Sequence, residues 1–205
     1  MRSVCSTLRT WSDRAFFALS ERRLCHGVDV RMLGPSPRER QELFQKVSDA
    51  IELIGERSPV YLRRLRRDLR GIWINLAAGN VAEYHDGARL CLLDRQHLSK
   101  SDVTESRVAA MLVHETTHAR LAKSGINYEP KRRSRIEAVC YRAEIRFAGR
   151  LSDGGAIAEQ ARLQMQQDPI RWSAEAARAR ARDRFRELGV PEWLIRFIVR
   201  AIPAD

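Results

Sequence analysis

The sequence predicts an α+β fold in which helices dominate and a small antiparallel sheet occupies about residues 72–93. Apolar residues recur at helical spacing over most of the chain. One stretch differs, because the short apolar run Ile72–Leu76 is followed by two strand-like segments joined at Asp86-Gly87, a dipeptide typical of hairpin turns. A chain of 205 residues is long enough for one domain with its own core. We therefore expect a single domain with three parts: N-terminal helices over 1–71, a core over 72–150 and a helical extension over 151–205.

The N-terminal part predicts three helices. The first lies around residues 11–23, where aromatic and apolar residues form a stripe of uncertain register. Ser36 and Glu39 form a capping box at the start of a second helix, which continues to about Arg57. A third helix covers residues 58–71, with leucines on one face and arginines on the other.

Helical patterns also follow the hairpin. Asp102 and Glu105 are expected to cap a helix that Gly125 ends. A polar loop then leads to a helix from Ser134 to about Gly149. Residues 153–203 are helical in pattern. Two breaks interrupt this last part, at Asp168-Pro169 and at Gly189-Val190-Pro191.

The helix after the hairpin carries the HExxH motif, His114-Glu115-Thr116-Thr117-His118. Residues four apart lie above one another on a helix, so both imidazoles can reach a single Zn²⁺ ion while Glu115 lies beside its open side. Glu137, near the start of the next helix, can supply a third ligand. Two histidines, one glutamate and water make an open site typical of catalytic zinc.

Other roles remain open for the acidic and thiol groups of the next helix. Glu137 can instead cap that helix in a box with Ser134, and Glu144 or Glu129 would then be the third ligand. Cys140 lies one turn from Glu137, but a cysteine in an apolar pattern is more often packed as a small apolar residue.

The hairpin, the HExxH helix and the following glutamate resemble the gluzincin class of zinc metallopeptidases over about residues 72–150. The resemblance implies one zinc ion held by His114, His118 and Glu137, and hydrolysis of a peptide bond in a protein or peptide by a metal-bound water with Glu115 as general base. Many gluzincins carry an acidic residue four positions after the ligand glutamate, where this chain has Tyr141. Glu144 can replace that residue in orienting the first histidine.

The chain also contains several candidates for a hydrogen-bond donor to the developing oxyanion. In zincins, the strand before the motif helix runs along the substrate cleft, which would place the end of the first hairpin strand near the substrate. An oxyanion needs a donor beside the reacting carbonyl, and the sequence does not choose among the candidates. These are Tyr84, His85, Tyr128 and Tyr141.

A net charge of +11 suggests an anionic partner or a solvated basic surface. Of the 37 cationic residues, 33 are arginine. They gather at 63–70, at 131–135 and at 178–186. The group from Lys131 to Arg135 is expected near the mouth of the site, where it would favour an acidic substrate. The alternative function is a nucleic-acid-binding regulatory protein on a zincin-like scaffold with little or no hydrolytic activity.

Composition excludes two classes of protein and indicates a compartment. Hydrophobic residues at 44% are too many for a disordered polycation, and no apolar run of about 18 residues predicts a membrane span. Charged residues interrupt the N-terminus where a secretory signal needs an apolar core. The four cysteines are widely spaced, so we expect reduced thiols and a cytoplasmic protein; the oligomeric state stays open.

Overall fold

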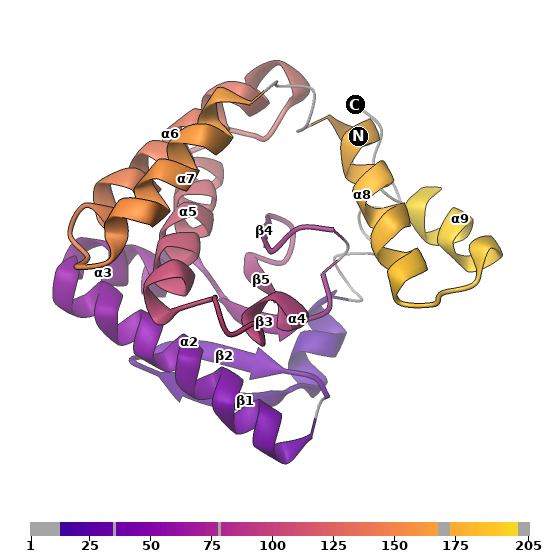
Figure 1. Cartoon of the computed structure of the whole chain (residues 1–205), viewed down its shortest axis with the longest axis horizontal. Coiled ribbons are helices and arrows are strands. Elements are labelled where there is room, and N and C mark those ends of the chain that lie inside the picture. The colour runs from indigo at the N-terminus through magenta and orange to yellow at the C-terminus, as the bar shows by residue number, and fades with distance from the viewer. Residues whose placement is uncertain (1–12, 35, 78, 168–172, 201–205) are drawn as a thin grey trace.

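The computed structural model describes residues 13–34, 36–77, 79–167 and 173–200. It confirms an α+β fold in which helices dominate, with the sheet preceding most of the helices in the chain (Figure 1). Three predicted features lie partly or wholly outside the described residues: residues 11–12 of the first helix, the break at Asp168-Pro169, and residues 201–203 at the end of the C-terminal helical part. Within those residues, no helix combines the length and apolar character that crossing a membrane requires.

The sheet has five strands in the order β1-β2-β3-β5-β4. Their bounds are Glu21–Cys25, Val28–Met32, Gly71–Asn75, Leu90–Asp94 and Ala82–His85, in that same order. β1 pairs antiparallel with β2, and β4 with β5, whereas β3 runs parallel to both β2 and β5. The hairpin at Asp86-Gly87 is therefore confirmed, but the expectation of a purely antiparallel sheet limited to 72–93 is wrong.

The two N-terminal strands correct the prediction of a helix over 11–23 and of only helices before residue 71. Residues 13–19 are helical, and β1 begins at Glu21. His26 and Gly27 both have positive φ (47° and 79°) and form the two-residue loop between the paired residues Cys25 and Val28. Such a loop matches the twist of a hairpin. β2 then buries alternate residues, with the period of a strand rather than a helix.

Two helices of the N-terminal part form as predicted. α2 covers Pro37–Arg57 and α3 covers Pro59–Asp68. Ser36 caps α2 by accepting a hydrogen bond from the Glu39 backbone N–H at 3.4 Å. The short α4, Arg95–Leu98, follows β5.

The helices that carry the motif residues are α5 (Glu105–Lys123) and α6 (Arg133–Ala148). Thr104 rather than Asp102 caps α5, accepting from the Arg107 N–H at 3.3 Å. A 3₁₀ turn, η1 (Pro130–Arg132), leads into α6, so Ser134 already lies within the helix. The capping box of Ser134 with Glu137 is therefore wrong, and the Glu137 carboxylate is available for other contacts.

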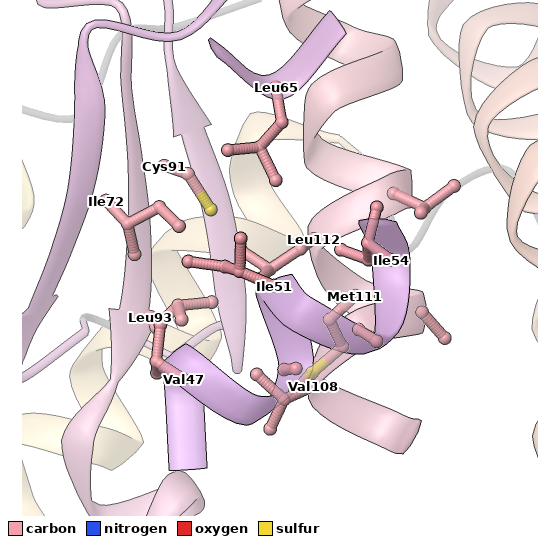
Figure 2. Close-up of a cluster of buried hydrophobic side chains, with 14 of the residues drawn as sticks. Val47, Ile51, Ile54, Leu65, Ile72, Cys91, Leu93, Val108, Met111 and Leu112 are labelled. Atoms are coloured by element: carbon pink, nitrogen blue, oxygen red, sulfur yellow. The ribbon is translucent and has the colours of Figure 1, made fainter. Parts of the chain in front are cut away.

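The main core lies between the sheet and α2 and α5. Figure 2 shows Ile72, Cys91 and Leu93 of the sheet facing Ile51 of α2 and Leu112 of α5. Nine consecutive residues of α5, Val108–Thr116, are buried, because α2, α3 and α6 all pack against this helix. The motif histidines therefore belong to a central helix that is held on several sides by its neighbours. Cys91 is fully buried, as expected of a cysteine packed as an apolar residue.

The Ile51→Ala variant tests this core. Ile51 is completely buried, so truncation removes apolar contacts and leaves a cavity. We expect the free energy of unfolding, measured by urea denaturation, to fall by about 2–5 kcal/mol. The exposed neighbour Glu52 gives the control, since Glu52→Ala should change stability by less than about 0.5 kcal/mol. Equal effects of the two substitutions would contradict this placement of the core.

The C-terminal third contains α7 (Gly154–Gln166), α8 (Ala174–Glu187) and α9 (Glu192–Arg200). The predicted break at 189–191 is confirmed, and Gly189 has a φ of 70°. α8 and α9 form a helical hairpin on the side of the molecule away from α6 and α7 (Figure 1). This hairpin is anchored to the sheet, because Arg184 Nη2 lies 3.4 Å from Asp94 Oδ1 at the end of β5.

Candidate metal centre

The packing of α5 against α6 brings His114, His118 and Glu137 together. The Nε2 atoms of the two histidines are 3.2 Å apart. His114 Nε2 lies 3.4 Å from Glu137 Oε2, and His118 Nε2 lies 3.5 Å from Glu137 Oε1. Ligand bonds of 2.0–2.1 Å to a tetrahedral ion place donor atoms roughly 3.3 Å apart. The three side chains therefore fit the spacing that a zinc ion requires.

Cys140 belongs to the same cluster. Its Sγ and one nitrogen each of His114 and His118 all lie within 4.8 Å of one another, so these three residues could hold one metal ion. Cys140 is completely buried on α6, one turn after Glu137. The sequence pattern favours an apolar role for Cys140, although its three-residue spacing from Glu137 places both residues on one helix face.

Glu144 and Tyr128 orient the converging side chains. His114 Nδ1 lies 2.9 Å from Glu144 Oε2, and a proton on Nδ1 leaves the Nε2 lone pair directed at the cluster. Tyr128 donates a hydrogen bond to Glu137 Oε1. The contact of Glu144 with the first histidine is the one that sequence analysis favoured, whereas the contact of Tyr128 with Glu137 was missed, because Tyr128 lies in an irregular loop.

The electrostatics of the cluster favour positive charge at its centre. Burial opposes a charged His114, but hydrogen bonds to Glu137 and Glu144 outweigh burial and raise the pKa of His114 to about 10. Burial likewise disfavours the Glu137 carboxylate, yet its contacts with His114 and His118 hold its pKa well below the usual range. Burial raises the pKa of Glu115. The carboxylates that favour the proton on His114 would also attract a divalent cation bound in its place.

The cluster opens into a cleft of about 670 Å³. Six elements line this cleft: β4, α4, α5, α6, α7 and α8. Among the described residues β4 is the last strand of the sheet and pairs with β5, and its residues Ala82, Glu83 and Tyr84 line the cleft. An extended peptide can pair with a strand edge of this kind. The cleft lining includes His114, Glu115, His118, Glu137, Tyr84 and Arg180.

The four candidate oxyanion donors have different surroundings in the structure. The rings of Tyr141 and Tyr128 pack edge-on against His114 and His118, at centroid distances of 4.6 and 5.6 Å. Tyr84 lines the cleft, and burial raises its pKa to about 12, so its hydroxyl keeps its proton. His85 instead contacts Asp13, with Nδ1 and Oδ2 3.0 Å apart. Tyr141 and Tyr128 therefore lie next to the histidines, but the Tyr128 hydroxyl donates to Glu137, and the Tyr84 hydroxyl donates to Asp86 Oδ1 at 3.4 Å.

Two other expectations are met only in part. Of the basic group 131–135, Arg133 alone is among the cleft residues, with its guanidinium carbon 5.5 Å from the centre of the Tyr128 ring. Lys131, Arg132 and Arg135 are exposed. Glu129, a fallback ligand, is also exposed and lies 3.9 Å from Arg132. The acidic residues that reach the cluster are Glu137 and Glu144.

Comparison with known proteins finds no matching family model, and neither curated proteins nor solved structures include a significant match. The resemblance to gluzincins therefore depends on the motif and on the geometry of the buried cluster. That cluster is consistent with a zincin-like metal site.

Loss of the Glu144 carboxylate tests its role in orienting His114. We expect Glu144→Ala to weaken zinc affinity by about 10–100-fold, because the tautomer and ring orientation of His114 are no longer held. Competition with a chromophoric chelator measures the affinity. Glu159→Ala on α7 is the control, since Glu159 pairs with Arg162. An unchanged affinity in Glu144→Ala would refute the orienting role.

Proposed function

We propose that the protein is a zinc-dependent metallopeptidase that hydrolyses a peptide bond in a protein or peptide substrate. The observation that carries this proposal is the convergence of His114, His118 and Glu137 within 3.5 Å, beside Glu115 and in a cleft bordered by a strand edge. Two nitrogen donors and a carboxylate are a ligand set that zinc uses in hydrolytic sites with one open position.

The residues that would hold the ion are His114, His118 and Glu137. Zinc, when bound, supplies Lewis acidity that lowers the pKa of a water molecule and polarises a substrate carbonyl. Glu144 keeps the His114 proton on Nδ1, and Tyr128 holds one oxygen of Glu137, so both side chains are fixed before an ion arrives.

Glu115 is the proposed general base. It lies between the two histidines in the motif, is buried like His114, and lines the same cleft as both histidines. Its carboxylate would take a proton from the attacking water and pass it to the leaving amine. Tyr84 and Tyr141 are the candidates to donate a hydrogen bond to the oxyanion, because the Tyr128 hydroxyl already donates to Glu137. The edge of β4, whose residues Ala82, Glu83 and Tyr84 line the cleft, would hold the substrate backbone in extended form.

Cleavage of a protein substrate tests this function. Purified protein should cleave an unfolded substrate such as reduced casein, lose this activity when a chelator removes the metal, and recover it with one equivalent of zinc per chain. Elemental analysis of the protein prepared without chelator should find that same stoichiometry. Absence of stoichiometric zinc, or cleavage that persists in the metal-free protein, would refute the proposal.

A closed, non-catalytic metal site is the second candidate, because Cys140 lies within 4.8 Å of both histidine nitrogens. A thiolate added to two histidines and Glu137 would fill all four positions of a tetrahedral ion. Cobalt(II) distinguishes the two cases, since a bound thiolate gives an intense near-ultraviolet charge-transfer band. For the peptidase, we expect wild type and Cys140→Ser to have the same cobalt spectrum and the same activity. A band lost in Cys140→Ser would favour the closed site.

A further inference from the structure

A second groove lies between α8 and α9 and has a volume of about 500 Å³. It is lined by Arg178, Arg182, Arg186, Glu192, Arg196 and Val199. Four guanidinium groups face one carboxylate, so the lining has an excess of positive charge. A groove of this composition attracts an anion, and guanidinium groups bind phosphate with two parallel hydrogen bonds.

The arginines of α8 form a regular row. Arg178, Arg182 and Arg186 are four residues apart, so they share one face of the helix and follow one another at about 6 Å along its axis. This interval is close to the separation of successive phosphates along a nucleic-acid strand. A single phosphate would use one position of the row, whereas a strand can contact all three arginines.

Acidic neighbours hold one end of this row in place. Arg186 Nε lies 2.6 Å from Glu192 Oε1, and Arg186 Nη1 lies 3.4 Å from Asp183 Oδ1. The pair with Glu192 joins α8 to α9, the pair with Asp183 lies within α8, and both orient Arg186. The groove is therefore a formed feature of the hairpin, which is also held together by Ala181, Ile195 and Val199 in its own small core.

An exposed tryptophan adjoins the groove. Trp193 follows Glu192 in the chain, and Trp193 is 72% exposed. It also precedes Arg196 by three residues, so Trp193 is a helical neighbour of two residues that line the groove, Glu192 and Arg196. Large aromatic side chains are seldom this exposed, and an aromatic beside a cationic groove is the usual platform for stacking bases.

We propose that the α8–α9 groove binds single-stranded nucleic acid, with the arginines on the phosphates and a base stacked on Trp193. The row of arginines favours a polyanion over a single phosphate, and Trp193 favours a ligand with aromatic bases over an acidic peptide. The groove goes beyond the peptidase function and does not depend on the metal cluster.

The groove and the metal cleft lie on different faces of the same helix. Ser173, Ala177 and Arg180 line the cleft, whereas the arginine row starting at Arg178 lines the groove. At 100° per residue, these two sets are centred on opposite sides of α8. A strand in the groove would therefore lie about one helix diameter, roughly 10 Å, from the cleft, which places proteins associated with that strand near the proposed active site.

Binding of a fluorescently labelled 15-nucleotide oligothymidine, measured by anisotropy, tests the proposal. Affinity should fall as salt rises, with a slope of about −0.7 per neutralised phosphate. The double variant Arg178→Ala/Arg182→Ala should make this slope shallower by about 1.4. Trp193→Ala should weaken binding about 5–150-fold, and Trp193→Phe should retain much of the affinity.

The matched control removes the same charge elsewhere. Arg63 and Arg70 are exposed near α3, so Arg63→Ala/Arg70→Ala should bind the oligonucleotide like wild type. Glu115→Gln should also bind like wild type, which separates this test from that of the peptidase. The proposal would be overturned by absence of binding at low salt, by equal losses in the two arginine variants, or by a polyglutamate peptide that competes equally while Trp193→Ala has no effect.

Discussion

Glu115→Gln is expected to retain zinc and to lose peptide hydrolysis. Glutamine has nearly the same shape as glutamate but accepts no proton at neutral pH, so the variant keeps the ligands and loses the general base. We expect kcat to fall by about 10²–10⁴-fold, the range for loss of a positioned acid–base group. Zinc content, substrate KM and the thermal midpoint should change little, since Glu115 is not a proposed ligand. Steady-state cleavage with elemental analysis of the same sample measures both quantities.

Glu83→Gln is the matched control for this variant. Glu83 is a carboxylate of β4 that lines the same cleft but is outside the HExxH motif. Its substitution should leave kcat within a few-fold of wild type. Equal losses in the two variants would mean that general negative charge in the cleft matters, and full activity in Glu115→Gln would rule out its role as general base.

His118→Ala is expected to remove the metal and, with it, the activity. The variant loses one of two nitrogen donors whose Nε2 atoms are 3.2 Å apart. Its zinc affinity should fall by more than the roughly 10–100-fold that is typical of changes at an orienting partner. The metal should then be lost on dialysis, and ligand-linked stabilisation by added zinc should disappear from thermal unfolding curves.

His97→Ala controls for the loss of a histidine from the cleft. His97 also lines the cleft, but it belongs to α4 and not to the cluster of His114, His118 and Glu137. The His97→Ala variant should bind zinc with the affinity of the wild type. A His118→Ala variant that keeps a full equivalent of zinc, with unchanged affinity, would show that the ion binds elsewhere.

The sequence predicts the helices well where local signals act alone. The capping box at Ser36 and the run of buried positions in α2 define that helix without help from distant residues. The pairing of β2 with β3 is different, since it joins segments separated by α2 and α3 and leaves no local signal. β1 was missed because four of its five residues are not buried, so it lacks the apolar alternation by which strands are recognised.

The motif predicts the metal cluster more completely than it predicts the surroundings. His114 and His118 are four residues apart on a helix, so their convergence follows from helix geometry alone. The position of Glu137 depends on how α6 crosses α5, which is a property of tertiary packing. The sequence names Tyr128 and Cys140 as candidates, but the contact of Tyr128 with Glu137 and the closeness of Cys140 to both histidines were found only in the structure, because they depend on a loop and on tertiary packing.

The basic residues lie in two separate places in the structure. Arg133 and Arg180 line the cleft, whereas Arg178, Arg182, Arg186 and Arg196 line a separate groove on the C-terminal hairpin. The spacing of arginines along α8 was visible in the sequence. Their separation from the cleft was not, because it depends on which face of α8 contacts the sheet through Arg184.

A crystal structure with anomalous diffraction at the zinc edge would locate the metal directly. We expect one anomalous peak per chain, coordinated by His114 Nε2, His118 Nε2 and the Glu137 carboxylate, with the fourth position open to the cleft beside Glu115. Absence of a peak at this cluster, or a peak whose fourth ligand is Cys140 Sγ, would contradict it.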